Sequence, residues 1–317
     1  MGDDRPGRAR TESVGMLFGI GAYGLWGLFP LYWKRLSSVP SLQILMHRIA
    51  WAFALTFVLA LLLGKRRLMA ELLRERKRLA ATIAAGFLVS LNWGIYIWAV
   101  NAGHIVETSI GYFLNPLVSV ALGSFVFKEK IDRGIKAACA IAAVGIAVLT
   151  VSYGKLPWIA LSLAATFSLY GLIKKLTNLD GLTGLAMETA PVMPFALGYL
   201  ILEELAGRGA FGRSGGIETS MLVLAGAVTA LPLFFFAEGV KRVPLSRMGF
   251  LQYISPTLQL ALGLFVFGET LSAAKAAAFA FIMAALVVFA ATRPRSTGGP
   301  SPALPPTARG PKRPGRG

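Results

Sequence analysis

Three ionisable side chains stand inside long apolar runs, where charge is unusual. His47 and Arg48 lie in the run 42–63, and Glu188 lies in the run 182–202. If such runs cross a lipid bilayer, charges within them are costly and mark pathways for solutes or ions. The pattern therefore predicts a binding or coupling site, with Glu188 able to carry a proton. The structural alternatives are an arginine that snorkels or bonds backbone carbonyls, a packing histidine, and a glutamate with a structural role.

A second set of candidate residues is aromatic or carries an amide. Its members are Asn92, Trp93, Tyr96, Tyr112, Asn115, Gln252, Tyr253 and Gln259. Helical spacing puts Asn92 and Tyr96 on one face, and Pro116 and Pro256 loosen the backbone hydrogen bonds near the others. Such a lining suits a neutral or zwitterionic organic solute that stacks and forms hydrogen bonds. The alternative is a set of interfacial aromatic belts and interhelical hydrogen bonds.

The chain lacks the motifs of common metal and nucleotide sites. It contains no Walker A, HExxH or CxxC motif, two histidines, and one cysteine, Cys139. Two histidines and one cysteine are too few to favour a metal cluster, a Cys-His nucleophile or a disulfide framework. We expect no catalytic residue, metal or cofactor. An intramembrane enzyme that uses Ser or Tyr beside His47 is the weakest hypothesis.

The composition explains what must position these residues. Of the 317 residues, 55% are hydrophobic and 15% are charged, and the mean hydropathy is +0.63; a typical soluble protein has about 25% charged residues. Apolar runs of about 20 residues span a bilayer, and their backbone must be satisfied internally, which favours helices. The sequence predicts an all-α membrane protein with ten transmembrane helices, at about 14–33, 42–63, 80–101, 105–127, 135–152, 157–173, 182–202, 219–240, 245–267 and 273–291.

The positive charges lie between these segments. The net charge of +17 therefore indicates topology and not nucleic-acid binding. With the N-terminus inside, 25 Lys and Arg residues fall in inside segments and six in outside connections. The positive-inside rule then predicts that both termini are cytoplasmic. The dense run 65–78 is expected to be a solvated loop or a short helix on the anionic inner leaflet.

The chain repeats itself at an offset of 140 residues. The stretches NPLVSVALGSFVFKEKI (115–131) and SPTLQLALGLFVFGETL (255–271) share eight of 17 residues, including a Pro, a Gly and a Glu in one register. The same offset superposes every predicted helix of the first half on one of the second. The predicted domains are a cytoplasmic N-terminal arm (1–13), two five-helix repeats (14–152 and 153–292), and a disordered basic cytoplasmic tail (293–317).

An odd number of helices in each repeat makes the two repeats inverted. Such symmetry gives two arrangements open to opposite sides, with a solute site near the midplane. Arg48 and Glu188 occupy equivalent positions, and the inversion separates them by about 10 Å along the membrane normal. A direct salt bridge then needs long side chains or a helix break, and a shared aqueous cavity is the favoured alternative. Small residues in the fifth and tenth helices are expected to hold the two halves, or two protomers, together.

Several stretches resemble one transporter family. They are AYGLWGLFPLYWK (22–34), LMHRIAW (45–51), LNWGIYIWAVNAGHIVETSIGYFLNPLVSVALG (91–123), LPWIALSLAATFSLYGL (156–172) and LQYISPTLQLALGLFVFGE (251–269). The chain resembles the EamA-type branch of the drug/metabolite transporter superfamily, and more closely its RarD-type (chloramphenicol-sensitive protein) members. The resemblance covers roughly 12–292. It implies a multi-pass protein of the bacterial inner membrane, with inverted five-helix halves around a central cavity, and it supplies no residue roles.

The sequence thus predicts a secondary-active or facilitative transporter of small organic solutes, either amino-acid-like molecules, metabolites or drugs. It would work by alternating access at a midplane site between inverted repeats. The expected partners are the lipid bilayer, the solute, protons as a coupling ion, and a second copy in a homodimer, with no nucleic acid. The alternative is a membrane receptor or assembly factor that moves no solute.

Overall fold

All regular structure that the computed structural model describes is helical. It describes residues 5–127, 133–177, 179–240, 242–243, 248 and 251–291. The elements are α1 (Arg5–Gly27), α2 (Phe29–Arg35), α3 (Ser41–Leu62), α4 (Arg66–Arg74), α5 (Arg76–Asn101), α6 (Ile105–Phe127), α7 (Arg133–Tyr153), α8 (Trp158–Thr177), α9 (Gly181–Thr189), α10 (Met193–Leu205), α11 (Gly216–Val240), α13 (Ile254–Ala261), the π-helix η1 (Leu262–Val266) and α14 (Ala273–Ala291).

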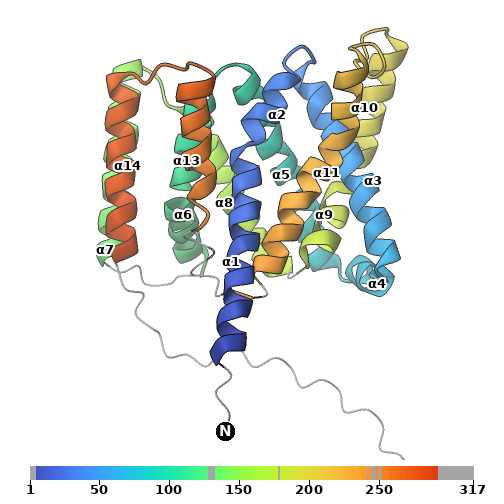
Figure 1. Ribbon diagram of the computed structural model, residues 1–317, viewed down its shortest axis with the longest axis horizontal. Helices are drawn as coiled ribbons and strands as arrows, with labels where there is room; N and C mark the ends of the chain where they lie inside the picture. The colour runs from blue at the N-terminus through green and yellow to red at the C-terminus, as the bar shows by residue number, and fades with distance from the viewer. Residues whose placement is uncertain are drawn as a thin grey trace, which may run out of the picture.

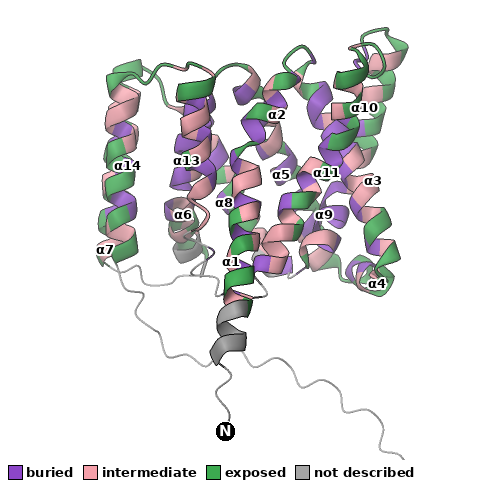
Figure 2. Ribbon diagram, in the orientation of Figure 1, coloured by how far each residue is buried: buried purple, intermediate pink, exposed green. Residues whose placement is uncertain are grey.

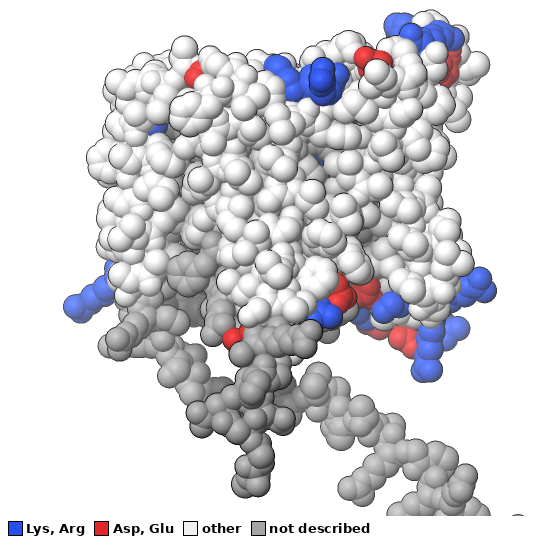
Figure 3. Space-filling view, in the orientation of Figure 1, with Lys and Arg blue, Asp and Glu red and all other residues white. Residues whose placement is uncertain are grey.

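The long helices stand side by side with their axes roughly aligned (Figure 1). Short α4 lies at one end of the bundle, which we call the α4 end, and α10 reaches the other, which we call the α10 end. On the face shown in Figure 3, charged side chains gather at these two ends and a nearly uncharged belt lies between them. Figure 2 shows buried residues concentrated between the helices and exposed residues on their outer faces. An exposed apolar belt between two charged rims is the surface that a bilayer requires.

The prediction of a helical membrane protein is confirmed, but within the described residues fewer than ten helices qualify as spans. By length and apolar composition, seven helices in this part of the chain can cross a membrane, and the bent pair α9 and α10 would make an eighth. In the other two predicted segments the described residues form mainly the shorter apolar helices Trp158–Lys174 and Ile254–Val266. Residues 245–247 and 249–250 of the ninth predicted segment lie outside the described part of the chain.

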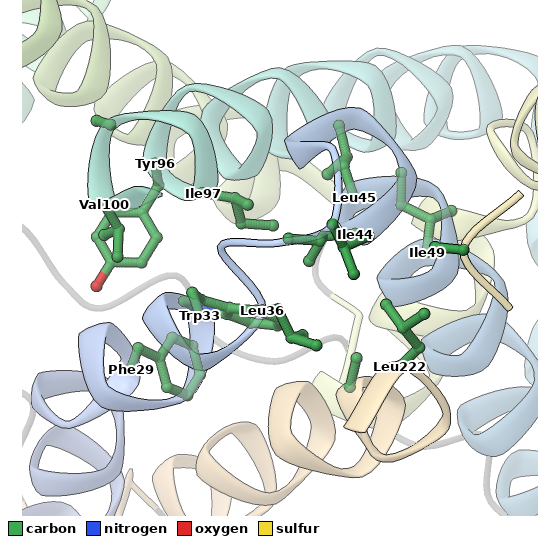
Figure 4. Close-up of a cluster of buried hydrophobic side chains, with 14 of the residues drawn as sticks. Phe29, Trp33, Leu36, Ile44, Leu45, Ile49, Tyr96, Ile97, Val100 and Leu222 are labelled. Atoms are coloured by element: carbon green, nitrogen blue, oxygen red, sulfur yellow. The ribbon is translucent and has the colours of Figure 1, made fainter. Parts of the chain in front are cut away.

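Helix neighbours come from distant parts of the sequence. At one edge of the bundle α7 packs on α14. Elsewhere α8 packs on α5 and α6, α1 packs on α11 and α13, and α3 packs on α9, α10 and α11. Figure 4 shows the cluster where α2, α3, α5 and α11 meet; it includes Phe29, Trp33, Ile44, Tyr96 and Leu222. The two halves of the sequence are therefore interleaved and do not form separate bundles.

Two of the predicted spans are broken where prolines lie. Leu28 separates α1 from α2, and Pro30 stands in the first turn of α2. Between α9 and α10 the axis bends by 53°, with Pro191 in the break and Pro194 in the first turn of α10. Proline lacks a backbone donor and clashes with the preceding turn, so it favours such breaks. The freed backbone groups are tolerated in a membrane where they are buried against protein.

Two glycines separated by the repeat offset allow the closest helix approaches near the candidate residues. A Cβ on Gly86 of α5 would lie 1.9 Å from the carbonyl oxygen of Glu188 on α9. A Cβ on Gly226 of α11 would lie 2.5 Å from the carbonyl carbon and oxygen of Trp51 on α3. Both contacts are to backbone atoms, which cannot rotate away as a side chain can. These glycines therefore set how closely α5 approaches α9 and α11 approaches α3.

The charged run 65–78 is more ordered than a loop. Its residues form α4 and the start of α5, and Met69 and Leu72 of α4 are buried. These two side chains pack with Ala60, Leu179 and Met187, so α4 covers the end of the bundle. The predicted N-terminal arm is also helical from Arg5 onward, while the predicted tail 293–317 lies outside the described residues.

Replacing either close-approach glycine by alanine should destabilise the fold. Because the new methyl group would meet backbone, we expect Gly86→Ala and Gly226→Ala to cost at or above the upper end of the ~1–3 kcal/mol usual for overpacking. Gly198→Ala on α10 is the matched control, since nothing lies within 4 Å of the added Cβ. The control should be neutral or stabilising, because alanine favours helix over glycine. Unfolding of the detergent-solubilised variants measures the difference, and equal stability of all three would contradict it.

Candidate functional site

Arg48 lies on α3 with its side chain buried among aromatic rings. Its Nε donates a hydrogen bond of 3.0 Å to Oγ1 of Thr229 on α11. Its Cζ lies 4.0 Å from the ring centroid of Trp93 and 5.0 Å from that of Trp33, with Phe29 at 5.7 Å. These distances permit cation–π interaction, which strengthens where water is excluded. We call Arg48, Phe29, Trp33, Trp93, Tyr96 and Tyr112 the arginine cage; the two tyrosines lie within electrostatic range of the guanidinium.

The glycine contact between α11 and α3 positions this arginine. Arg48 lies one helical turn before Trp51, and Thr229 lies one turn after Gly226. The close approach at Gly226 and Trp51 therefore brings the Thr229 hydroxyl to the guanidinium. The Thr229 hydroxyl in turn donates to the carbonyl oxygen of Ala225 at 2.8 Å, which leaves its lone pairs for Arg48.

Several donors of the cage have no partner. Arg48 Nη1, the Tyr96 hydroxyl and Trp33 Nε1 are buried without a hydrogen-bond partner among the described residues. Arg48 is 3% exposed, and no carboxylate in the described part of the chain lies within ion-pair distance of it. A buried charge and buried donors left unpaired are unfavourable. The cage thus combines a buried positive charge with three unpaired donors among the described residues.

Glu188 is paired with a different cation. Lys174 Nζ lies 2.7 Å from Oε1 of Glu188, and the Tyr170 hydroxyl donates to Oε2 at 2.8 Å. Lys174 also donates to the Tyr170 oxygen at 2.9 Å, which closes a triad. The Glu188 side chain is fully buried and that of Lys174 is 25% exposed. The sequence left open a salt bridge between Arg48 and Glu188. In the structure Glu188 pairs instead with Lys174, which lies directly after the predicted segment 157–173.

The start of α9 is built to hold this triad in place. Asp180 caps the helix by accepting a hydrogen bond from the backbone of Thr183, and it also faces Lys65 at 3.6 Å. Burial alone would raise the pKa of Asp180, but hydrogen bonds from Thr183 and the charge of Lys65 outweigh it and lower that pKa. The cap is therefore ionised at neutral pH. One turn on, Gly184 leaves room for the amine of Lys174, since a Cβ there would lie 3.0 Å from Nζ.

A row of aromatic rings joins the cage to the triad. Ring centroids are 5.6 Å apart between Tyr96 and Tyr112, 6.1 Å between Tyr112 and Phe167, and 6.1 Å between Phe167 and Tyr170. The row runs across α5, α6 and α8. It places the buried guanidinium and the buried carboxylate at opposite ends of one aromatic surface, although they form no direct bond.

The remaining candidates lie elsewhere. His47 stacks on Phe211 of the α10–α11 connection, with centroids 5.3 Å apart. Asn92 donates to the carbonyl oxygen of Leu163 and to the Thr166 hydroxyl, so it ties α5 to α8. The partners of both side chains thus lie outside the arginine cage, and the interhelical alternative describes Asn92 well.

A separate polar group lies where α1, α6 and α13 meet. Gln259 donates to the Ser255 hydroxyl at 3.2 Å and to the Trp26 carbonyl at 3.4 Å, and it accepts from Thr108 at 3.4 Å. Tyr253 stacks on Phe113 within an apolar cluster.

Asn115 and Gln252 differ in burial. The Asn115 carbonyl oxygen accepts from Ser168, while its side-chain oxygen is buried without a hydrogen-bond partner in the described part of the chain. Gln252 is partly buried.

Of the sequence candidates, the structure gathers only Arg48, Trp93, Tyr96 and Tyr112 into one cage. Among the described residues no group of three His, Cys, Asp or Glu side chains could hold a metal ion.

Sequence reasoning missed the partners of both buried charges. Thr229 and Tyr170 carry no sequence signal of their own in an apolar run. Lys174 did have one, because the repeat offset superposes it on Lys34, and it stands four residues, one turn, after Tyr170. Lys34 also points its amine inward, to the carbonyls of Val100 and Asn101.

Comparisons with known proteins agree with one another. The sequence profile of the EamA-like transporter family matches residues 13–151. The chain is 46% identical to the uncharacterised transporter YojE of Bacillus subtilis, over 87% of this chain and 93% of that protein. It is 43% identical to protein RarD of Streptomyces exfoliatus, over 87% and 88%, and 36% identical to protein RarD of Escherichia coli, over 89% and 95%. One crystal structure shares the fold, with a TM-score of 0.57 at 21% identity, covering 87% of this chain and 97% of that chain.

The triad predicts a strong energetic coupling between Glu188 and Lys174. Removing one partner of a buried ion pair costs ~3–5 kcal/mol because it leaves the other charge unpaired; the partial exposure of Lys174 places the cost at the lower end. We expect Glu188→Gln and Lys174→Gln each to destabilise the protein, and the double variant to recover more than half of the loss.

A double-mutant cycle on unfolding in mixed micelles measures this coupling. The control cycle is Arg67→Gln with Glu71→Gln on α4, a surface pair whose side chains are 91% and 48% exposed. Its coupling should be no more than about 0.5 kcal/mol. Additive losses at Glu188 and Lys174 would show that the triad contributes no specific pairing.

Proposed function

The chain belongs to the EamA-like transporter family and is a membrane transporter, not an enzyme, and from this premise we propose that it moves a small organic solute by alternating access, with the arginine cage as its solute site. The observation that carries the proposal is the buried Arg48, which is charged, oriented by Thr229, and unmatched by any carboxylate in the described residues. Such a residue inside a membrane is expensive and is retained where a solute completes its interactions.

The pattern of helix contacts supports inverted five-helix repeats. Exchanging each helix for its equivalent 140 residues away turns the contact of α5 with α8 into that of α11 with α1. It likewise turns the contact of α5 with α9 into that of α11 with α3, and the contact of α6 with α8 into that of α13 with α1. All six contacts are present. The glycines Gly86 and Gly226 follow the same offset, and the family profile covers 13–151, which nearly coincides with the first proposed repeat, 14–152.

The triad is suited to couple a conformational change to protons. A proton delivered to Glu188 would cancel its charge and weaken its hold on Lys174, which already reaches partly exposed surface. Glu188 lies in the last turn of α9, directly before the break that leads to α10. Release of Lys174 would therefore free a segment that is already bent, and this is where we place the motion that exposes the cage.

The orientation that we propose puts the α4 end in the cytoplasm. This end carries α4 and the start of α5, with the densest run of Lys and Arg in the chain. The relatives come from bacteria, so the membrane would be the bacterial inner membrane. The mostly exposed outer faces of α7 and α14 are the surfaces that a homodimer would use.

Solute flux in proteoliposomes tests the transport function. The wild-type protein should move at least one solute from a panel of amino acids, organic acids and aromatic metabolites, and a pH gradient should change the rate. Arg48→Gln should lower the rate at least 10-fold because it removes the guanidinium from the site. The double variant Glu188→Gln with Lys174→Gln keeps the charge balance and should lose the response to the pH gradient.

Arg67→Gln is the control for this experiment, because it removes one positive charge from an exposed position on α4. It should leave the rate unchanged. Absence of flux across the whole panel, from protein shown to be folded, would favour a receptor or assembly factor that moves no solute.

Cysteine labelling tests the orientation. In a Cys139→Ala background, Ser37→Cys in the α2–α3 connection places a thiol at an exposed position of the α10 end, and Ser214→Cys in the α10–α11 connection places one at a partly exposed position of the same end. Ala70→Cys places one at an exposed position on α4. An impermeant maleimide added to whole spheroplasts should label the first two and not the third. Labelling of Ala70→Cys alone would reverse the orientation.

A further inference from the structure

We propose that the solute of the arginine cage is an organic anion, a carboxylate or an equivalent monoanion on an apolar body, and not a zwitterion or a cation. This rests on the proposed function, since it assumes that the cage is the solute site. It differs from the sequence expectation of a neutral or zwitterionic solute. The difference comes from three features: the local charge, the kind of unpaired polar atoms, and the partners of Glu188.

The local charge favours an anion. Arg48 is 3% exposed, and its described neighbours are aromatic rings and the Thr229 hydroxyl. Cation–π contacts stabilise the guanidinium by about 0.5–2 kcal/mol, which is less than the cost of burying it alone. A bound carboxylate would supply the missing countercharge. In surroundings of low polarity this attraction is much stronger than in water.

The unpaired polar atoms that belong to the arginine cage are donors. Arg48 Nη1 and Trp33 Nε1 can only donate hydrogen bonds, and the Tyr96 hydroxyl can donate its proton. A carboxylate accepts several hydrogen bonds and fits this set, and guanidinium–carboxylate bonds are among the strongest in proteins. An ammonium group brings only donors, so it would leave the cage atoms unpaired and add a second positive charge.

The buried carboxylate of Glu188, which could pair with an ammonium group, is already occupied. In the triad both carboxylate oxygens of Glu188 are bonded, one to Lys174 at 2.7 Å and one to Tyr170 at 2.8 Å. An amino acid would need to displace the lysine to pair its amine there. A solute without an amine pays no such penalty, so the structure favours a simple carboxylate over the matching amino acid.

The rest of the cluster around these donors is apolar. Its buried members include Phe29, Ile97, Leu36 and Leu222 (Figure 4), and Tyr112 and Trp93 pack against it. These side chains suit a flat or aliphatic body attached to the anionic group. The polar recognition is thus concentrated on one end of the solute.

The test compares solutes that differ only in charge. Hexanoate, benzoate and 3-phenylpropanoate are each paired with their primary amides. Phenylalanine adds an amine to 3-phenylpropanoate, and 3-phenylpropylamine replaces its carboxylate by a cation. Binding is measured by calorimetry on the full chain in lipid nanodiscs, and flux is measured in proteoliposomes. We expect at least one carboxylate to bind 10-fold or more tightly than its amide, than phenylalanine and than 3-phenylpropylamine.

Variants connect this preference to the cage. Arg48→Gln should weaken carboxylate binding by about 10- to 100-fold, the loss expected for a charge-assisted hydrogen bond, and should leave amide binding nearly unchanged. Tyr96→Phe removes one unpaired donor, keeps the ring, and should weaken carboxylate binding by about 2- to 10-fold. If Arg48→Gln does not fold, Tyr96→Phe alone tests whether carboxylate binding depends on the cage. Arg67→Gln on α4 removes an exposed positive charge and should change neither value.

The outcomes separate this inference from the proposed function. Equal or tighter binding of phenylalanine or the amine, or carboxylate binding that Arg48→Gln and Tyr96→Phe leave intact, overturns the inference. Absence of carboxylate binding also overturns it, even where another solute is transported. Cage-dependent carboxylate binding without any flux supports the inference and overturns the transport mechanism.

Discussion

A charge buried in a membrane protein needs a partner, and the structure provides one for Glu188 but not for Arg48. Lys174 and Tyr170 satisfy both oxygens of the carboxylate. Around Arg48, aromatic faces and one hydroxyl hold the guanidinium while Nη1 stays unpaired among the described residues. The first arrangement is complete as it stands. The second is incomplete among the described residues, and for this reason we propose that a solute from outside completes it.

The helix packing serves this arrangement of charge. Gly226 allows α11 to approach the α3 backbone beside Trp51, and the same approach brings Thr229 to Arg48. Gly86 allows α5 to approach the α9 backbone at Glu188 itself. In a bilayer the hydrophobic effect does not drive helices together, so close contact through small residues has to supply the packing energy. The two glycines therefore link the stability of the bundle to the position of its two buried charges.

Much of this could be predicted from the sequence, because hydropathy reports directly on lipid exposure. The helical class, the segment positions and the family resemblance all followed from apolar runs and motifs. The cage was found in part, since Arg48, Trp93, Tyr96 and Tyr112 were all candidates. The contact partners of individual side chains could not be predicted. Asn92 forms a hydrogen bond to α8, and His47 stacks on Phe211. Helix rotation and the break before α10 decide such pairs, and neither is encoded in the spacing of a single segment.

The proposed repeat relates Arg48, which is unpaired among the described residues, to the paired Glu188. Arg48 and Glu188 occupy equivalent positions of the proposed repeats, so the two halves carry opposite charges there. Here one half carries a cation that awaits a ligand, and the other carries an acid that is already bonded to Lys174. In our proposal the two sites respond to different inputs, an anion at one and a proton at the other. Because aromatic rings from Tyr96 to Tyr170 join them, a rearrangement at either end would repack the same surface. Specialising the two halves is therefore a physical route from a duplicated fold to a transporter in which solute binding and protonation affect each other.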